Sequence, residues 1–72
     1  MKYRIGEMAE FFGLTKEAIR YYERKGIVTS TRDWQTGYRY YERDEITTLK
    51  QIRTYESLGF SLDEAQAMVV ET

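Results

Sequence analysis

A row of basic side chains is spaced by four residues, at Lys16, Arg20 and Arg24, so in a helix all three lie on one face. Such a helix can enter the major groove of DNA, which is about 12 Å wide. Arginine can donate two hydrogen bonds to guanine, and a tyrosine such as Tyr21 can donate to a phosphate or pack on a thymine methyl group. The row therefore predicts a DNA-reading helix. The alternative is a solvated helix face with ion pairs such as Glu17–Arg20.

A second group interleaves arginine with aromatic side chains, a composition that suits contact with a sugar–phosphate backbone. It comprises Arg32, Trp34, Tyr38, Arg39, Tyr40 and Tyr41. The alternative is a set of cross-strand tyrosine pairs over a small core. Strand alternation puts Tyr38 and Tyr40 on one face and Arg39 and Tyr41 on the other, so both interpretations can hold. We expect Tyr41, followed by Tyr40, in the core and Arg39 at DNA, whereas Trp34 fits DNA, a partner or neither.

Several chemistries are excluded by composition. The chain has no Cys and no His, which removes the common nucleophile–base pairs and zinc–thiolate sites, and it has no glycine-rich phosphate motif. The adjacent carboxylates of Asp63 and Glu64 fit helix capping better than catalysis. We therefore expect no enzyme activity, no metal and no cofactor. No run approaches about 18 apolar residues and the N-terminus lacks an apolar signal core, so we expect a cytoplasmic protein without a membrane span.

The charge of the chain is unevenly distributed. The net charge is −1, which by itself argues against nucleic acid. However, residues 16–43 hold seven bases and four acids, a net +3, whereas residues 44–72 hold two bases and six acids, a net −4. This segregation predicts a basic surface separate from an acidic one.

Two helices joined by a tight turn are predicted at the start of the chain. Between residues 5 and 12, apolar side chains recur at helical spacing, and Gly13 follows at a helix C-terminal position. Thr15 can cap a second helix that ends at Gly26. Its inward face would hold Leu14, Ala18, Ile19 and Tyr22. Its outward face would hold Lys16, Arg20, Tyr21, Glu23 and Arg24. This pattern predicts a helix-turn-helix.

A hairpin and two more helices complete the predicted fold. Strands are expected at Ile27–Thr31 and Tyr38–Tyr41, around a polar loop at residues 32–37. Asp44 can cap a third helix that Gly59 closes, and Ser61–Glu64 form a capping box with Phe60 as its hydrophobic staple. The fourth helix would run to the chain end, which fits either fraying or a longer natural chain. We predict a mainly α-helical single domain, residues 1–72, with four helices and a two-stranded wing.

Longer strings make the chain recognisable. They are IGEMA at residues 5–9, GLT at residues 13–15, RYYE at residues 20–23, GYRYY at residues 37–41 and LGFSLDE at residues 58–64. In this order and spacing they resemble the N-terminal DNA-binding domain of the MerR family of bacterial transcription regulators, over about residues 3–70.

The resemblance implies a winged helix-turn-helix in which the second helix reads DNA, the hairpin is the first wing, and helices three and four form the second. It implies a homodimer that binds pseudo-palindromic promoter DNA and distorts it for RNA polymerase. Arg20 and Tyr21 would face the groove and backbone beside Lys16, Tyr38 and Arg39 would hold phosphates, Arg53 would do so from the second wing, and Tyr22 would pack inward. The predicted DNA-contacting set is Thr15, Lys16, Arg20, Tyr21, Arg24, Arg32, Tyr38, Arg39 and Arg53.

The chain also departs from the family pattern. Val28–Ser30 stand where members often have proline, which predicts a looser turn into the wing. Glu56 and Ser57 stand where relatives often carry a basic residue, which predicts weaker second-wing contacts. Trp34 enlarges the wing tip. The family's dimerisation helix and effector domain would follow this segment and are absent from it.

Two rival functions remain open from the sequence. One is a stand-alone architectural DNA binder, like the small winged-helix excisionases. The other is a protein-interaction module, in which Trp34 and the acidic residues after position 55 would bind a partner.

Overall fold

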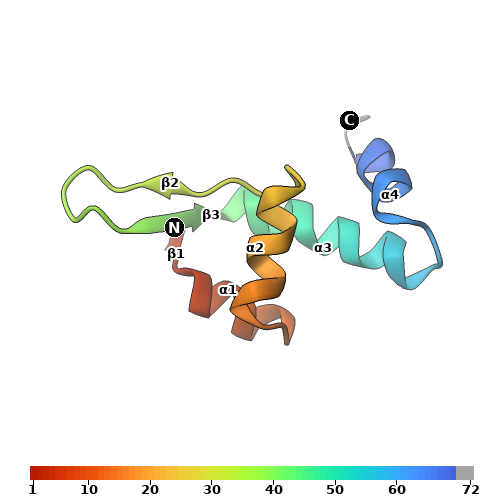
Figure 1. Ribbon diagram of the computed structural model, residues 1–72, viewed down its shortest axis with the longest axis horizontal. Helices are drawn as coiled ribbons and strands as arrows, with labels where there is room; N and C mark the ends of the chain where they lie inside the picture. The colour runs from red at the N-terminus through yellow and green to blue at the C-terminus, as the bar shows by residue number, and fades with distance from the viewer. Residues whose placement is uncertain (70–72) are drawn as a thin grey trace.

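The computed structural model describes residues 1–69, which form four α-helices and a three-stranded antiparallel sheet (Figure 1). The elements are β1 (Lys2–Tyr3), α1 (Ile5–Phe12), α2 (Lys16–Arg24), β2 (Thr31–Arg32), β3 (Arg39–Glu42), α3 (Arg43–Ser57) and α4 (Leu62–Val69). The predicted fold class is confirmed. Within the described residues, no helix is long and apolar enough to span a membrane.

The turn between α1 and α2 follows the prediction. Gly13 adopts the left-handed conformation, with φ 67°, which lets the chain leave α1 sharply. Thr15 caps α2, because its Oγ1 accepts a hydrogen bond from the Ala18 backbone N–H at 3.1 Å. The two helices pack together through apolar side chains, with Met8 of α1 and Ile19 of α2 fully buried.

The wing differs from the predicted two-stranded hairpin in two ways. The first strand is shorter and later than expected, because the Ile27 and Val28 side chains are buried in the core and β2 begins only at Thr31. The sheet also gains a third strand, in the order β1-β3-β2, with Lys2 opposite Glu42 and Tyr3 opposite Tyr41. Pairing of the N-terminus with β3 connects the base of the wing to α1.

The third helix begins earlier than predicted. Its N-cap is Glu42 rather than Asp44, since β3 runs directly into α3 without an intervening loop. Asp44 instead lies in the first turn, where a negative charge interacts favourably with the helix dipole. The chain reverses at Gly59, with φ 98°, close to the expected end.

The capping box before α4 is present in full. The Ser61 backbone N–H donates to Glu64 at 2.8 Å, and the Glu64 N–H donates to the Ser61 hydroxyl at 3.1 Å. The Phe60 ring meets the edge of Tyr55 in α3, with centroids 5.9 Å apart. The prediction that α4 continues to the chain end falls on residues 70–72, outside the described part.

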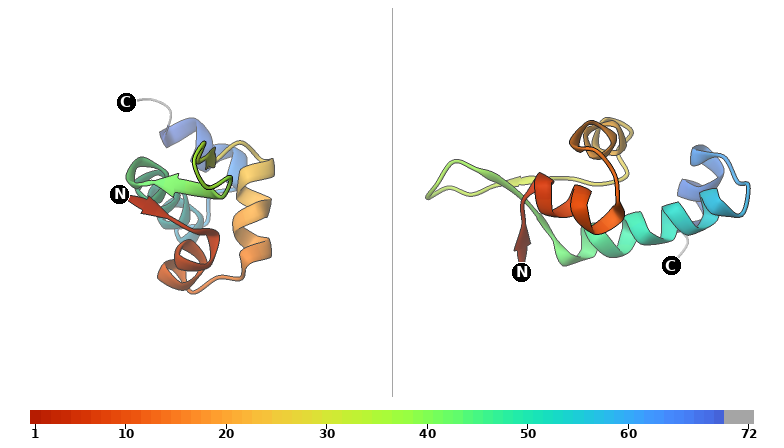
Figure 2. Two further views of the ribbon diagram at one scale, coloured as in Figure 1. Left: turned by 90° about the vertical axis from the view of Figure 1, so that its left-hand side faces the viewer. Right: turned by 90° about the horizontal axis from the view of Figure 1, so that it is seen from below.

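The core lies where the helices and the sheet meet. Its fully buried side chains are Met8, Ile19, Val28, Leu49 and Ile52. The molecule measures 40 × 25 × 20 Å, with the wing at one end of the long axis, α4 near the other and α2 between them (Figures 1 and 2). This arrangement leaves one side of α2 and the whole wing tip in solvent.

Candidate nucleic-acid interface

The basic row of α2 lies on the solvent side of the helix, as the spacing predicts. Lys16, Arg20 and Arg24 are all exposed, and Tyr21 beside them is 43% exposed. On the opposite side, Ile19 is fully buried and Tyr22 is 5% exposed. The helix therefore presents three cations and an aromatic ring to solvent. Thr15 is exposed at its N-terminus, but its hydroxyl is already engaged as the cap.

Arg20 also forms an ion pair with Glu17, as expected if this face of the helix were only a solvated one. Its Nη1 lies 2.8 Å from Oε1 of Glu17, with the two side chains 50% and 71% exposed. An exposed pair of this kind is worth about 0–1 kcal/mol. A phosphate or a guanine can therefore replace Glu17 as the partner of Arg20 at little cost.

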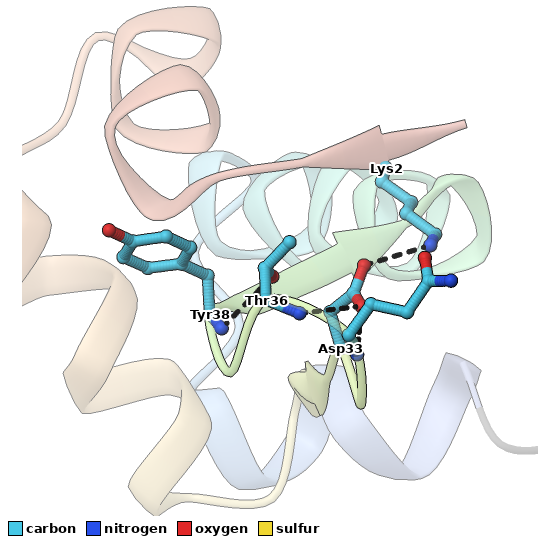
Figure 3. A network of polar contacts seen from close by, with 5 residues as sticks. Lys2, Asp33, Thr36 and Tyr38 are labelled. Atoms are coloured by element: carbon cyan, nitrogen blue, oxygen red, sulfur yellow. Dashed lines mark hydrogen bonds and ion pairs between the residues drawn. The ribbon is translucent and has the colours of Figure 1, made fainter.

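The wing loop is ordered around Asp33 (Figure 3). The Asp33 carboxylate accepts backbone N–H bonds from Gln35 at 2.8 Å and Thr36 at 3.3 Å, and it pairs with Lys2 of β1 at 3.2 Å. These backbone N–H groups, together with Lys2, lower the pKa of the Asp33 carboxyl, and the bond to Asp33 raises the pKa of Lys2. The Tyr38 N–H closes the loop on the Thr36 hydroxyl at 3.2 Å.

Two exposed side chains, Trp34 in this loop and Arg32 at the end of β2, were considered as contacts for DNA. Trp34 is 87% exposed, so it fills no part of the core. Arg32 is exposed and donates from Nη1 to the Gly37 carbonyl at 3.0 Å, which holds the guanidinium along the loop.

Two cations near the N-terminus lie against the rings of Tyr38 and Tyr40 in the wing, and the sequence did not predict either contact. The guanidinium of Arg4 lies 4.2 Å from the centroid of the Tyr38 ring, and the ammonium of Lys2 lies 4.7 Å from that of Tyr40. Tyr38 remains 58% exposed, so Arg4 extends the candidate surface. The only signal in the sequence was the alternation of Lys2, Tyr3 and Arg4, which gives no hint of the distant strand it pairs with.

On the other face of β3, Arg39 and Tyr41 meet α2 through Glu23. The Tyr41 hydroxyl donates to Oε1 of Glu23 at 2.6 Å, and the Ser30 hydroxyl donates to Oε2 at 2.7 Å. Arg39 in turn donates from Nη1 to the Ser30 oxygen at 3.2 Å. Glu23 was expected outside the fold, and that expectation was wrong because the wing folds back over this part of α2.

The same contacts determine the ionisation of the buried groups. Burial alone would raise the pKa of Glu23, but hydrogen bonds from Tyr41 and Ser30 and the charge of Arg39 outweigh it and lower that pKa. Burial, followed by the bond to Glu23, raises the pKa of the Tyr41 hydroxyl. Glu23 is therefore a carboxylate at neutral pH, and it accepts two hydrogen bonds. The same contacts hold Ser30, the last residue of the Val28–Ser30 turn for which a looser structure was expected.

Arg53 lies in α3, where it contacts Tyr22 instead of standing free. Its Nη1 is 3.3 Å from the Tyr22 hydroxyl, which itself donates to Glu56 at 2.7 Å. Burial is the main cause that raises the pKa of Tyr22. Arg53 is nevertheless exposed, and a guanidinium has further N–H groups besides the one that bonds to Tyr22. Glu56, in a position expected to weaken the second wing, serves here to join α3 to α2.

One open hollow brings the helix and wing candidates together. It has a volume of about 320 Å³ and lies between α2 and the wing. Its lining comprises Ile5, Arg20, Glu23, Ser30, Arg39 and Tyr41. Arg20 and Arg39 are thus neighbours on one surface although 19 positions separate them in the chain. Arg53 does not line this hollow.

Comparison with known proteins identifies relatives of this chain. The model of the MerR HTH family regulatory proteins matches residues 3–71. A mercuric resistance operon regulatory protein of Bacillus cereus is 41% identical over 69 residues, 96% of this chain and 52% of the relative. The regulator CueR of Escherichia coli is 38% identical over 65 residues, 90% of this chain and 48% of the relative. The chain thus spans about half the length of these two relatives.

Solved structures show the same fold. A MerR family transcriptional regulator from Bacillus cereus superposes with a TM-score of 0.86 at 31% identity, over 99% of this chain and 53% of the other. HiNmlR, a MerR family regulator lacking the sensor domain and bound to promoter DNA, superposes with a TM-score of 0.78 at 23% identity, over 96% of this chain and 55% of the other. The latter likeness bears on the fold alone.

Proposed function

The chain belongs to the MerR HTH family of regulatory proteins, and from that membership we propose that residues 1–72 form one domain that binds double-stranded promoter DNA and distorts it. The supporting observation is the hollow in which Arg20 of α2 and Arg39 of β3 lie on one exposed surface. A recognition helix and a wing that share a surface can contact one duplex together. The family match does not favour the excisionase-like or protein-interaction alternatives.

We assign different tasks to the exposed side chains of this surface. Arg20, with Tyr21 and Lys16 beside it, reads base edges or the adjoining backbone from the major groove. The remaining contacts are to phosphates, which position the domain without reading sequence. These are assigned to Thr15, Arg24, Arg32, Tyr38, Arg39 and Arg53, with Arg4 added by the structure. Because the Thr15 hydroxyl already caps α2, we assign the DNA contact of this residue to its other exposed atoms.

The whole natural protein would act as a homodimer in the cytoplasm. Two copies of this domain would read two half-sites of one promoter, separated by a helical turn or a multiple of it. Distortion of the intervening DNA would alter how RNA polymerase uses that promoter. A single domain lacks the avidity of the pair, so its binding would be weak.

The experiment is a fluorescence-anisotropy titration at several salt concentrations. The probes are a duplex with the promoter upstream of this gene and a duplex with the same bases scrambled. We expect salt-dependent binding that prefers the promoter. If the 72-residue chain is silent, the titration is repeated with two copies fused through a coiled coil. Equal affinity for both duplexes, or no binding by the fused dimer, would overturn the proposal.

A further inference from the structure

We propose that Glu23 is a positioning residue for DNA binding, which acts through Ser30 to hold the Arg39 guanidinium where it meets the DNA backbone. This inference rests on the proposed function. Glu23 itself touches no DNA in this scheme. It connects the recognition helix to the wing, so that both approach the duplex as one body.

The direction of each hydrogen bond supports the assignment. Glu23 is ionised and can only accept, so the hydroxyls of Tyr41 and Ser30 must each donate a hydrogen bond to it, at 2.6 and 2.7 Å. The Ser30 oxygen then has lone pairs left, and Arg39 donates to it at 3.2 Å. The carboxylate thus determines how the hydroxyl of Ser30 is oriented, and that hydroxyl determines where the guanidinium lies.

The Arg39 side chain keeps donors for DNA in this arrangement. A guanidinium carries five N–H groups, and Ser30 accepts one of them. Arg39 is exposed, whereas Ser30 is 8% exposed. The anchor is therefore buried, and the other N–H groups of the exposed arginine remain for further partners. An arginine held in one orientation loses less conformational entropy when a phosphate binds.

The charge of Glu23 allows an experiment to distinguish a positioning role from a purely electrostatic effect on DNA binding. A carboxylate in a hollow lined by Arg20 and Arg39 repels a phosphate by simple Coulomb interaction. If Glu23 were only a nearby negative charge, Glu23→Gln would tighten DNA binding. If Glu23 positions Arg39, the same change weakens binding, because one carboxylate oxygen becomes an amide nitrogen, which donates and cannot accept a hydrogen bond from a hydroxyl.

The test compares Glu23→Gln, Arg39→Ala and the double variant in the natural full-length protein. The probe is the promoter duplex upstream of the gene, titrated at several salt concentrations. We expect Glu23→Gln to weaken binding about twofold to tenfold. We expect it to have little further effect once Arg39 is gone, a non-additivity that general destabilisation would not produce. Both single variants should lower the salt slope by up to about 0.9, the loss of one phosphate contact.

A second pair of variants keeps the test open if Glu23→Gln does not fold. Ser30→Ala removes the hydroxyl without changing charge, and Ser30→Thr keeps it. We expect weaker binding and a lower salt slope for the alanine variant and recovery of both for the threonine variant. Thr47→Ala and Arg43→Ala are matched controls, since both side chains line a separate groove between α1 and α3.

The outcomes separate this inference from the proposed function. Absence of promoter binding by the unsubstituted protein would remove the proposed function itself. Binding that depends on Arg39, but is tightened by Glu23→Gln or unaffected by Ser30→Ala, would overturn only the positioning role. Additive losses from Glu23→Gln and Arg39→Ala would also overturn it.

Discussion

The hydroxyl of Tyr22 in α2 donates a hydrogen bond to Glu56 of α3 at 2.7 Å, across 34 positions of the chain. The next residue, Glu23, accepts a hydrogen bond from the hydroxyl of Tyr41 in β3 at 2.6 Å. Two adjacent residues of the recognition helix therefore bond to the two wings. Tyr22 is the donor toward α3, and Glu23 is the acceptor from β3. This pair of bonds connects α2 to both.

The first prediction concerns the bond to α3. Tyr22→Phe removes a hydroxyl from a side chain that is 5% exposed and leaves Glu56 and Arg53 without it. We expect the free energy of unfolding to fall by about 0.5–1.5 kcal/mol. Urea unfolding followed by circular dichroism measures the change, and Tyr21→Phe on the exposed side of the helix is the control. Equal effects of the two substitutions would contradict the role of this bond.

The N-cap of α2 provides the second prediction. Thr15→Ala removes the acceptor for the Ala18 N–H and should cost about 1 kcal/mol of stability. Thr15→Ser keeps the hydroxyl and should restore most of it. Thermal unfolding of the two variants checks this. If both variants unfold alike, the hydroxyl does not stabilise the helix.

Base reading by Arg20 is the third prediction. We expect Arg20→Ala to weaken promoter binding by about 1–3 kcal/mol and to reduce the preference over a scrambled duplex. Anisotropy titration with both duplexes measures the two effects separately. Arg43→Ala removes the same charge from the groove between α1 and α3 and should leave the preference intact.

A substitution of Glu17, the ion-pair partner of Arg20, provides a further test of base reading by Arg20. Glu17→Gln releases Arg20 from its 2.8 Å ion pair and removes a negative charge from the side of α2 that we propose to face DNA. Promoter binding should be unchanged or tighter. Loss of binding in this variant would mean that Glu17, and not Arg20 alone, organises the surface.

The wing loop yields a pH-dependent prediction. The pKa of Asp33 is lowered in the folded protein, first by the Gln35 N–H and then by Lys2. Its stabilising contribution is therefore complete above its unfolded pKa, about 3.9, and is lost as the pH falls through the lower folded value. Asp33→Asn should destabilise the protein at pH 7 but not where Asp33 is protonated in both states. Urea unfolding at pH 7 and at a series of lower pH values tests this, and a loss that does not shrink as the pH falls would refute it.

The sequence by itself determined the helices and the turns between them. Helical spacing of apolar residues identified the buried faces of α1 and α2, Gly13 and Thr15 marked the turn, and the capping box located the start of α4. Strand alternation also separated the two faces of β3 correctly. These signals are local, because each depends on residues within about four positions of one another.

Only the tertiary structure decided how these elements join. A two-residue strand has no periodicity to detect, so β1 became visible only through its pairing with β3, some 40 positions away. Glu23 reads locally as a solvated helix residue, yet it lies beneath Ser30 and Tyr41 because the wing returns to α2. The placement of Arg20 beside Arg39 has the same origin. Contacts between distant segments depend on how the chain packs as a whole, and the local propensities of the sequence do not predict them.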